Sequence, residues 1–195
     1  MSGPLSYYGD HPLAEPTPFL KRRVVLAGAP GVGEGLVGST LCSLTGWPFV
    51  EIERAVEHDA GHSIARLMVH EGEAMVSARC WAHVARALVR QPLSVIAVPA
   101  IVLAPSPRLK YVLQNADLHY ITAPVEEQVA WLEKRRIRDG GRLGWFPNGM
   151  SGPPSVEVLH QACAPVARDA TVSHAVRPAA HLRTARRLMQ MLTTG

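Results

Sequence analysis

The chain has 195 residues, which is enough for one domain with its own core and too few for two domains of ordinary size. Hydrophobic residues make up 47% of it and charged residues 18%, a composition that excludes an intrinsically disordered chain. The formal net charge is +4, and no apolar run reaches the roughly 18 residues that a membrane-spanning helix needs. We therefore expect one folded domain and no membrane span.

Residues 1–22 are interpreted as a proline-rich N-terminal extension, and residues 23–195 as the folded domain. The extension has no secretory hydrophobic region, and Asp10 and Glu15 argue against an organellar transit peptide. Its prolines exclude a stable helix, so it is either a loose tail or an extended arm that lies on a neighbouring protein.

The cysteines Cys42, Cys80 and Cys163 lie far apart in the sequence. An odd number without C-x-x-C spacing argues against a disulfide framework and against a zinc site. We expect reduced thiols in an intracellular compartment, either the cytosol or the mitochondrial matrix, with no cleavable signal evident.

Strands and helices alternate from the start of the domain. A buried strand at Val24–Ala27 is followed by a glycine-rich turn, a helix at Glu34–Leu44 and a second strand at Phe49–Ile52. The next pattern is helical to Arg90 and is broken at Gly61 and Gly72, with Ser63 as the N-cap of its second piece.

The alternation continues to the end of the chain. The further elements that we expect are a strand at 95–98, helices at 108–114 and 125–138, a strand at 119–121, a helix at 156–166, a strand at 170–172 and a helix at 179–192. This order predicts an α/β fold in which helices cover both faces of a parallel sheet.

Glycine and proline punctuate residues 139–154, which we interpret as a loop. A loop of this length inside a compact domain is commonly a lid or a binding loop. Its aromatic residues Trp145 and Phe146 either tuck under the loop or contact another protein.

The glycine-rich turn has the frame of a Walker A loop, G-x-x-x-x-G-K-[ST]. Gly28, Gly31 and Gly33 allow backbone N–H groups to converge on phosphate oxygens at the start of a helix. Glu34 stands where that motif has its lysine, and Gly35 stands where it has the hydroxyl that binds magnesium.

The stretch GWPFVEIERAVEHDAGHSIARLMVHEGEAMVSAR at residues 46–79 closely resembles the shikimate kinase family pattern, G-x-P-F-x-D-x-D-x-x-I-E-x-x-x-G-x-S-I. The positions that keep this frame are Phe49, Glu57, Gly61, Ser63, Ile64, Gly72 and Glu73. The later VIAVPAIVL aligns with the V-I-A-x-G-G-G segment of that family. The resemblance implies a three-layer αβα fold of the P-loop NTPase type, with a five-stranded parallel sheet and a lid.

The resemblance also implies where functional side chains would stand. The acid that orients the substrate hydroxyls falls at Glu53, and the arginine that binds the substrate carboxylate falls at Ser77. The glycine triplet of the substrate pocket becomes Pro99, Ala100 and Ile101, and only the lid arginine is kept, as Arg142.

These replacements lead us to expect a catalytically inactive pseudoenzyme with no cofactor and no metal. A carboxylate at ~4 Å from a phosphate costs roughly 4 kcal/mol at an effective dielectric constant near 20. Phosphoryl transfer depends on positioning and charge neutralisation, both of which the replacements weaken. Glu34 either binds the loop amides as an internal anion or points into solvent. His58 and His62 are not expected to hold a metal, because Gly61 breaks the helix between them.

On this hypothesis the domain is a scaffold subunit of a larger protein or ribonucleoprotein assembly, for example in the mitochondrion. RNA would bind through the basic segments 134–142 and 183–187, although such segments are also typical of solvated helix faces. One alternative is an atypical ATP-dependent shikimate-type kinase that uses Arg142 or Lys134 in place of the missing lysine. A third is a regulatory module that binds a nucleotide or a metabolite without turnover.

Overall fold

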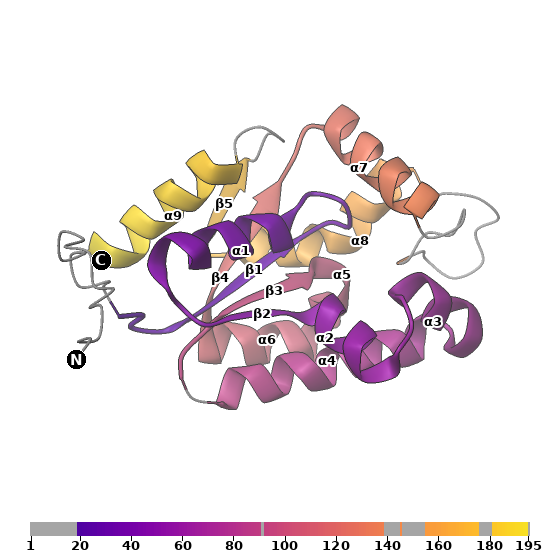
Figure 1. The fold of residues 1–195 in the computed structure, drawn as a ribbon, viewed down its shortest axis with the longest axis horizontal. Helices are drawn as coiled ribbons and strands as arrows, with labels where there is room; N and C mark the ends of the chain where they lie inside the picture. Colours follow the sequence, from indigo (N-terminus) through magenta and orange to yellow (C-terminus); the bar gives the residue numbers. More distant parts are fainter. Residues whose placement is uncertain (1–18, 91, 139–144, 146–154, 176–180, 195) are drawn as a thin grey trace, which may run out of the picture.

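The computed structural model describes residues 19–90, 92–138, 145, 155–175 and 181–194. They form a five-stranded parallel sheet with helices on both faces, so the predicted three-layer αβα fold is confirmed (Figure 1). The strand order is β2-β3-β1-β4-β5. Most of the N-terminal extension lies outside the described residues.

The five strands all run parallel, with β1 at the centre. Their bounds are Arg23–Gly28 for β1, Phe49–Glu51 for β2, Val95–Pro99 for β3, Ala116–Thr122 for β4 and Val172–Ala175 for β5. Val25 of β1 lies beside Ile96 of β3 and Leu118 of β4, and all three side chains are fully buried. A central strand that is covered on both faces explains the continuous apolar run at its position in the sequence.

Helices cover both faces of the sheet (Figure 1). The first face carries α1 (Glu34–Thr45) and α9 (His181–Thr194), which also pack on each other. The second face carries α4 (Glu73–Val89), α6 (Ser106–Asn115) and α8 (Val156–Asp169). The helix α7 (Val125–Arg138) packs against α8, and none of the described helices is long and apolar enough to cross a bilayer.

The predicted breaks in the long helical stretch are confirmed. The stretch forms α2 (Ile52–Ala60), α3 (Ile64–Glu71) and α4, and the glycines between them have φ values of 68° and 81°. Ser63 caps α3, since its side chain accepts a hydrogen bond from the backbone N–H of Arg66 at 3.3 Å.

One short helix was not predicted, and several bounds differ: Ile52 begins α2 and does not end β2, and β4 runs over Ala116–Thr122 and not only over 119–121. The apolar run after β3 turns into a short helix, α5 (Ala100–Leu103), which the pattern of the sequence did not indicate. The last strand begins at Val172 and not at Ala170, because α8 runs on to Asp169 in spite of Pro165 and Ala170 serves as its C-cap.

The chain leaves β1 towards β2 through α1, and it returns through β3 to reach β4 on the other side of β1. The order of the strands therefore reverses between β1 and β3. In open parallel sheets, ligands bind beyond the carboxyl ends of the strands at such a switch point.

Candidate phosphate-binding site

The glycine-rich turn between β1 and α1 has the backbone of a phosphate-binding loop. Gly31 and Gly33 have φ values of 90° and 89°, a region that residues with a Cβ rarely adopt. Gly28 is packed so closely on β4 that a Cβ there would lie 2.8 Å from the carbonyl oxygen of Ile121. These glycines let the turn place its N–H groups at the start of α1, where the helix dipole favours an anion.

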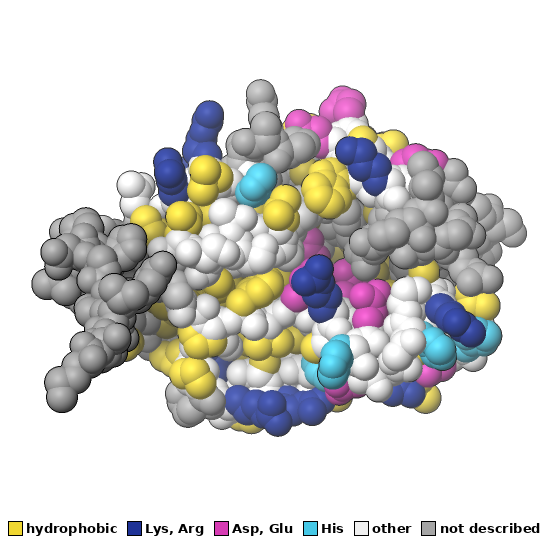
Figure 2. All heavy atoms as spheres, in the orientation of Figure 1, with side chains coloured by type: hydrophobic (Ala, Val, Ile, Leu, Met, Phe, Trp, Pro, Cys, Tyr) yellow, Lys and Arg dark blue, Asp and Glu magenta, His cyan; other side chains and the backbone are white. Residues whose placement is uncertain are grey.

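A cavity of about 320 Å³ opens in front of this loop. Figure 2 shows acidic side chains around the hollow at the centre of the viewed face. The volume is within the range of small-molecule sites. The cavity brings together six of the residues predicted for the site, namely Gly31, Gly33, Glu34, Gly35, Glu53 and Pro99.

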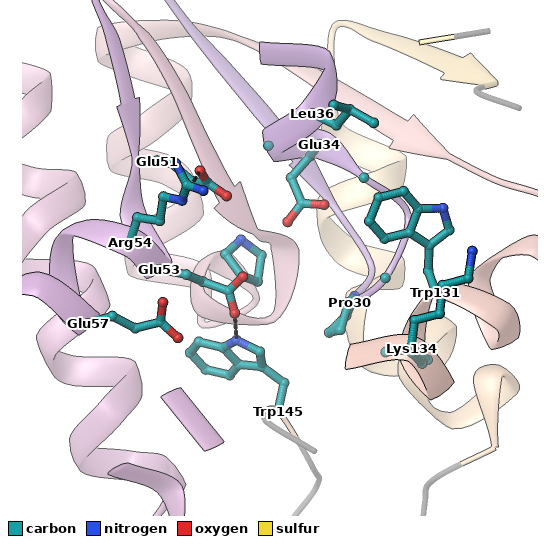
Figure 3. Close-up of a pocket in the computed structure, with 15 residues that line it drawn as sticks. Pro30, Glu34, Leu36, Glu51, Glu53, Arg54, Glu57, Trp131, Lys134 and Trp145 are labelled. Carbon is teal, nitrogen blue, oxygen red and sulfur yellow. Dashed lines mark hydrogen bonds and ion pairs between the residues drawn. The ribbon is translucent and has the colours of Figure 1, made fainter. Parts of the chain in front are cut away.

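Glu34 faces the cavity and not the solvent. Glu34 is only 8% exposed, and its carboxylate points from the first turn of α1 towards the space in front of Pro30 (Figure 3). Burial raises the pKa of the Cys163 thiol to about 12, and the negative charge of Glu34 adds to this effect. The reading in which Glu34 points into solvent is therefore wrong.

Gly35 leaves room for the carboxylate of Glu51. A Cβ at position 35 would lie 2.5 Å from Oε1 of Glu51, so a serine or threonine there would require this acid to move. Oε2 of Glu51 also pairs with Nε of Arg54 at 3.4 Å. A carboxylate oxygen thus occupies the space beside α1 where a side-chain hydroxyl of the Walker A pattern would stand.

Glu53 and Trp145 close the side of the cavity nearest α2 (Figure 3). The indole Nε1–H of Trp145 donates a hydrogen bond to Oε1 of Glu53 at 2.6 Å, and the two residues are 3% and 8% exposed. Trp145 adopts a φ of 56°, which is uncommon for a residue with a large side chain. Trp145 is therefore buried and does not form an exposed contact, while Phe146 and the rest of the loop lie outside the described residues.

The remaining predicted residues are placed away from the cavity or cannot be placed. Ser77 on α4 accepts a hydrogen bond from Nη1 of Arg108 at 2.7 Å, and this guanidinium also donates to the carbonyl oxygen of Val102 at 3.0 Å. Ala100 and Ile101 belong to α5 and are not part of the cavity wall. Arg142 lies outside the described residues.

The cavity wall also contains residues that the sequence did not single out for the site. Glu51, Arg54 and Trp131 are the main ones, and Lys134 was named only as a substitute cation. Glu51 could have been found, because it lies near the end of the predicted strand Phe49–Ile52, at the edge where parallel sheets bind ligands. Trp131 could not, because its place on the wall depends on how α7 packs against the loop.

The family model of shikimate kinase matches residues 30–140, which is more than half of the chain. The chain belongs to the shikimate kinase family. A shikimate kinase of Psychrobacter cryohalolentis is 28% identical over 169 residues, which cover 87% of this chain and 86% of that protein. A shikimate kinase of Symbiobacterium thermophilum is 44% identical over 50 residues, a match that covers 26% of this chain.

Solved shikimate kinases share the fold. The enzyme of Acinetobacter baumannii, solved in complex with shikimate, superposes with a TM-score of 0.72 at 24% identity and covers 88% of this chain and 92% of its own. That of Aquifex aeolicus gives a TM-score of 0.66 at 18% identity, covering 87% and 95%.

The expectation that the chain is not an enzyme is wrong. The family to which it belongs is a family of kinases, and the curated relatives that it matches are named shikimate kinase. The replacements at positions 34 and 35 therefore have to be explained within an enzyme family.

Proposed function

We propose that this chain is an atypical ATP-dependent kinase of the shikimate type, which phosphorylates a small molecule that carries hydroxyl groups. In this proposal Lys134 supplies the cation that position 34 lacks. The observation that carries it is that Lys134, from α7, lines the same cavity as Gly31 and Gly33 of the loop. An ammonium group on this wall can neutralise phosphate oxygens that the loop amides bind.

The described residues also fit a magnesium ion that arrives with the nucleotide. Proteins usually hold Mg²⁺ with one or two carboxylates, together with water and phosphate oxygens. Glu51 would hold it from the space beside Gly35, with Glu34 on the same wall. When bound, Mg·ATP supplies the phosphoryl group, and the metal offsets part of the charge of the two glutamates.

The acceptor would bind on the side of the cavity formed by Glu53 and Trp145. A carboxylate has about four acceptor positions, so Glu53 can accept from substrate hydroxyls while it keeps the hydrogen bond from Trp145. The buried indole fixes the direction of this acid, and the nearby Glu57 is held in turn because its Oε1 accepts from the backbone N–H of Ile64 at 2.9 Å.

Charge-matched variants test the role of Lys134. We expect Lys134→Ala to weaken the binding of Mg·ATP about tenfold in calorimetric titrations, which is about 1.4 kcal/mol. Lys110, which is exposed on α6 away from the cavity, provides the control, since Lys110→Ala removes the same charge from the surface. Equal affinities for the two variants would contradict the proposal.

A role as a subunit of a protein or ribonucleoprotein assembly stays a prediction. The basic segment 183–187 lies on α9 with Arg183, Arg186 and Arg187 exposed, whereas residues 139–142 lie outside the described part of the chain. RNA binding at this segment would give an affinity that falls steeply with salt. Size measurement of the endogenous protein after gentle lysis tests whether it resides in an assembly.

A further inference from the structure

Helix α7 contacts the back of the phosphate loop at two points one turn apart. Gln128 is completely buried, and its Nε2 donates a hydrogen bond to the carbonyl oxygen of Pro30 at 2.7 Å. Leu132 packs against Gly31 so closely that a Cβ at this glycine would lie 2.8 Å from Cγ of the leucine. The loop backbone and the helix therefore form one packed unit on this side.

A second partner fixes the orientation of the Gln128 amide. Nε2 of His160, from α8, lies 2.8 Å from Oε1 of Gln128. Because Oε1 accepts from this ring N–H, the amino group of the amide is left facing Pro30. Rotation of the amide would break both hydrogen bonds in a buried place, and each unsatisfied buried group costs about 1–3 kcal/mol.

The same helix carries Lys134. It lies six residues after Gln128 in the sequence, which is roughly 9 Å along a helix with a rise of 1.5 Å per residue. A helix is stiff over this length, so the contact at Gln128 determines how far the backbone of Lys134 lies from the loop. The attraction between an ammonium and a phosphate falls with their separation, which makes this distance matter for binding.

We propose that Gln128 is a positioning residue: by attaching Pro30 to α7, it sets the separation between the phosphate-binding amides and Lys134. The inference rests on the proposed function, because it assigns Lys134 to the phosphate. It adds that the replacement cation works only while the loop and α7 are joined, and that His160 supports this junction from α8.

A thermodynamic cycle separates positioning from a general structural role. Mg·ATP affinity is measured by calorimetry for the full chain, for Gln128→Leu, for Lys134→Ala and for the double variant, at a temperature where circular dichroism shows all four folded. When Lys134 is present, we expect Gln128→Leu to weaken Mg·ATP binding about tenfold. In the Lys134→Ala background, we expect the same substitution to weaken it less than about threefold. An equal loss in both backgrounds would overturn the inference, since Gln128 would then act independently of Lys134.

A second measurement does not depend on nucleotide. Hydrogen exchange of the peptide that spans residues 29–35 is compared between Gln128→Leu and Gln161→Leu, a control on the exposed side of α8. We expect faster exchange in the loop for Gln128→Leu alone, and unchanged exchange would overturn the junction itself. If the natural chain binds no Mg·ATP, the proposed function fails, while this measurement still decides whether Gln128 holds the loop.

Discussion

At the scale of single residues, the changes at positions 35 and 51 depend on each other. The family pattern in this stretch has aspartate where this chain has Glu51, and the longer acid reaches into the space that Gly35 leaves empty. A side chain at position 35 would not fit beside Glu51, because its Cβ would meet the carboxylate. The replacements at positions 35 and 51 thus form one packed arrangement.

This coupling can be measured. Gly35→Ser alone should lower the free energy of unfolding or leave it unchanged, because the gain in helix propensity is offset by the displacement of Glu51. Combined with Glu51→Asp, the same substitution should stabilise the protein, with a coupling energy of roughly 0.5–3 kcal/mol. Urea unfolding of the four chains in the cycle gives this number. Strictly additive effects would show that the two positions do not share space.

Trp145 illustrates how one residue can be placed only by the fold. The sequence left two readings open for it, and the hydrogen bond to Glu53 decides between them. No local pattern could indicate that contact, since 91 residues separate the two positions in the chain. Its position beside an acid at the carboxyl edge of the sheet makes it part of the site.

At the scale of elements, the turn between α2 and α3 links helix capping to the cavity. Ser63 caps α3, and Glu57, which lines the cavity from α2, accepts a hydrogen bond from the N–H of Ile64. Two of the free N–H groups at the start of α3, those of Ile64 and Arg66, are thereby satisfied by side chains. This is why the sequence could predict the start of the helix, although it could not show that the acid also faces a ligand site.

Ser63→Ala should lower the free energy of unfolding by about 1 kcal/mol, as is typical for the loss of a serine N-cap. Ser63→Gly should lower the free energy of unfolding by only a few tenths of about 1 kcal/mol, because glycine tolerates the cap conformation. Ser43→Ala, at an exposed position inside α1, is the matched control and should be neutral or slightly stabilising. A loss of stability at Ser43 as large as that at Ser63 would argue against a capping effect.

At the scale of the whole molecule, a buried histidine pair joins the edge strand to the rest of the sheet. Nδ1 of His119 in β4 lies 3.0 Å from Nε2 of His174 in β5, and the rings are stacked. Burial lowers the pKa of His174 to about 4, helped by the positive charges of His119 and Arg187. Burial also lowers the pKa of His119, although Asp117 acts in the opposite direction.

Stability should therefore depend on pH. The unfolded chain binds protons on these histidines near pH 6.5 and the folded chain does so only at lower pH, so the free energy of unfolding falls as the pH drops from about 6.5 to 4. The loss should be on the order of a few kcal/mol and complete below the folded pKa. His174→Gln keeps a donor for His119 and should flatten this dependence, whereas His62→Gln at an exposed site should not.

The fold was largely predictable and the site only in part. Buried strands that are separated by helical segments predict a parallel sheet, and the glycine breaks separate α2, α3 and α4 as the sequence indicates. The end of α8 was misjudged, because the predicted helix stopped at Val166 while the helix runs on to Asp169, and local propensity does not determine such boundaries closely. The prediction of the cavity wall was incomplete for a different reason. Arg54 and Trp131 reach the wall only through the packing of α2 and α7 around the loop.

The most direct test of the central claim is acceptor-dependent phosphoryl transfer by the purified chain. Formation of ADP from Mg·ATP is followed with and without a panel of hydroxyl-bearing acids and polyols, with shikimate as the first compound, for the natural chain and for Lys134→Ala. We expect ADP formation that requires one of these acceptors and that falls about tenfold or more in Lys134→Ala. Mg·ATP that neither binds nor turns over with any acceptor, in a protein shown to be folded, would contradict it.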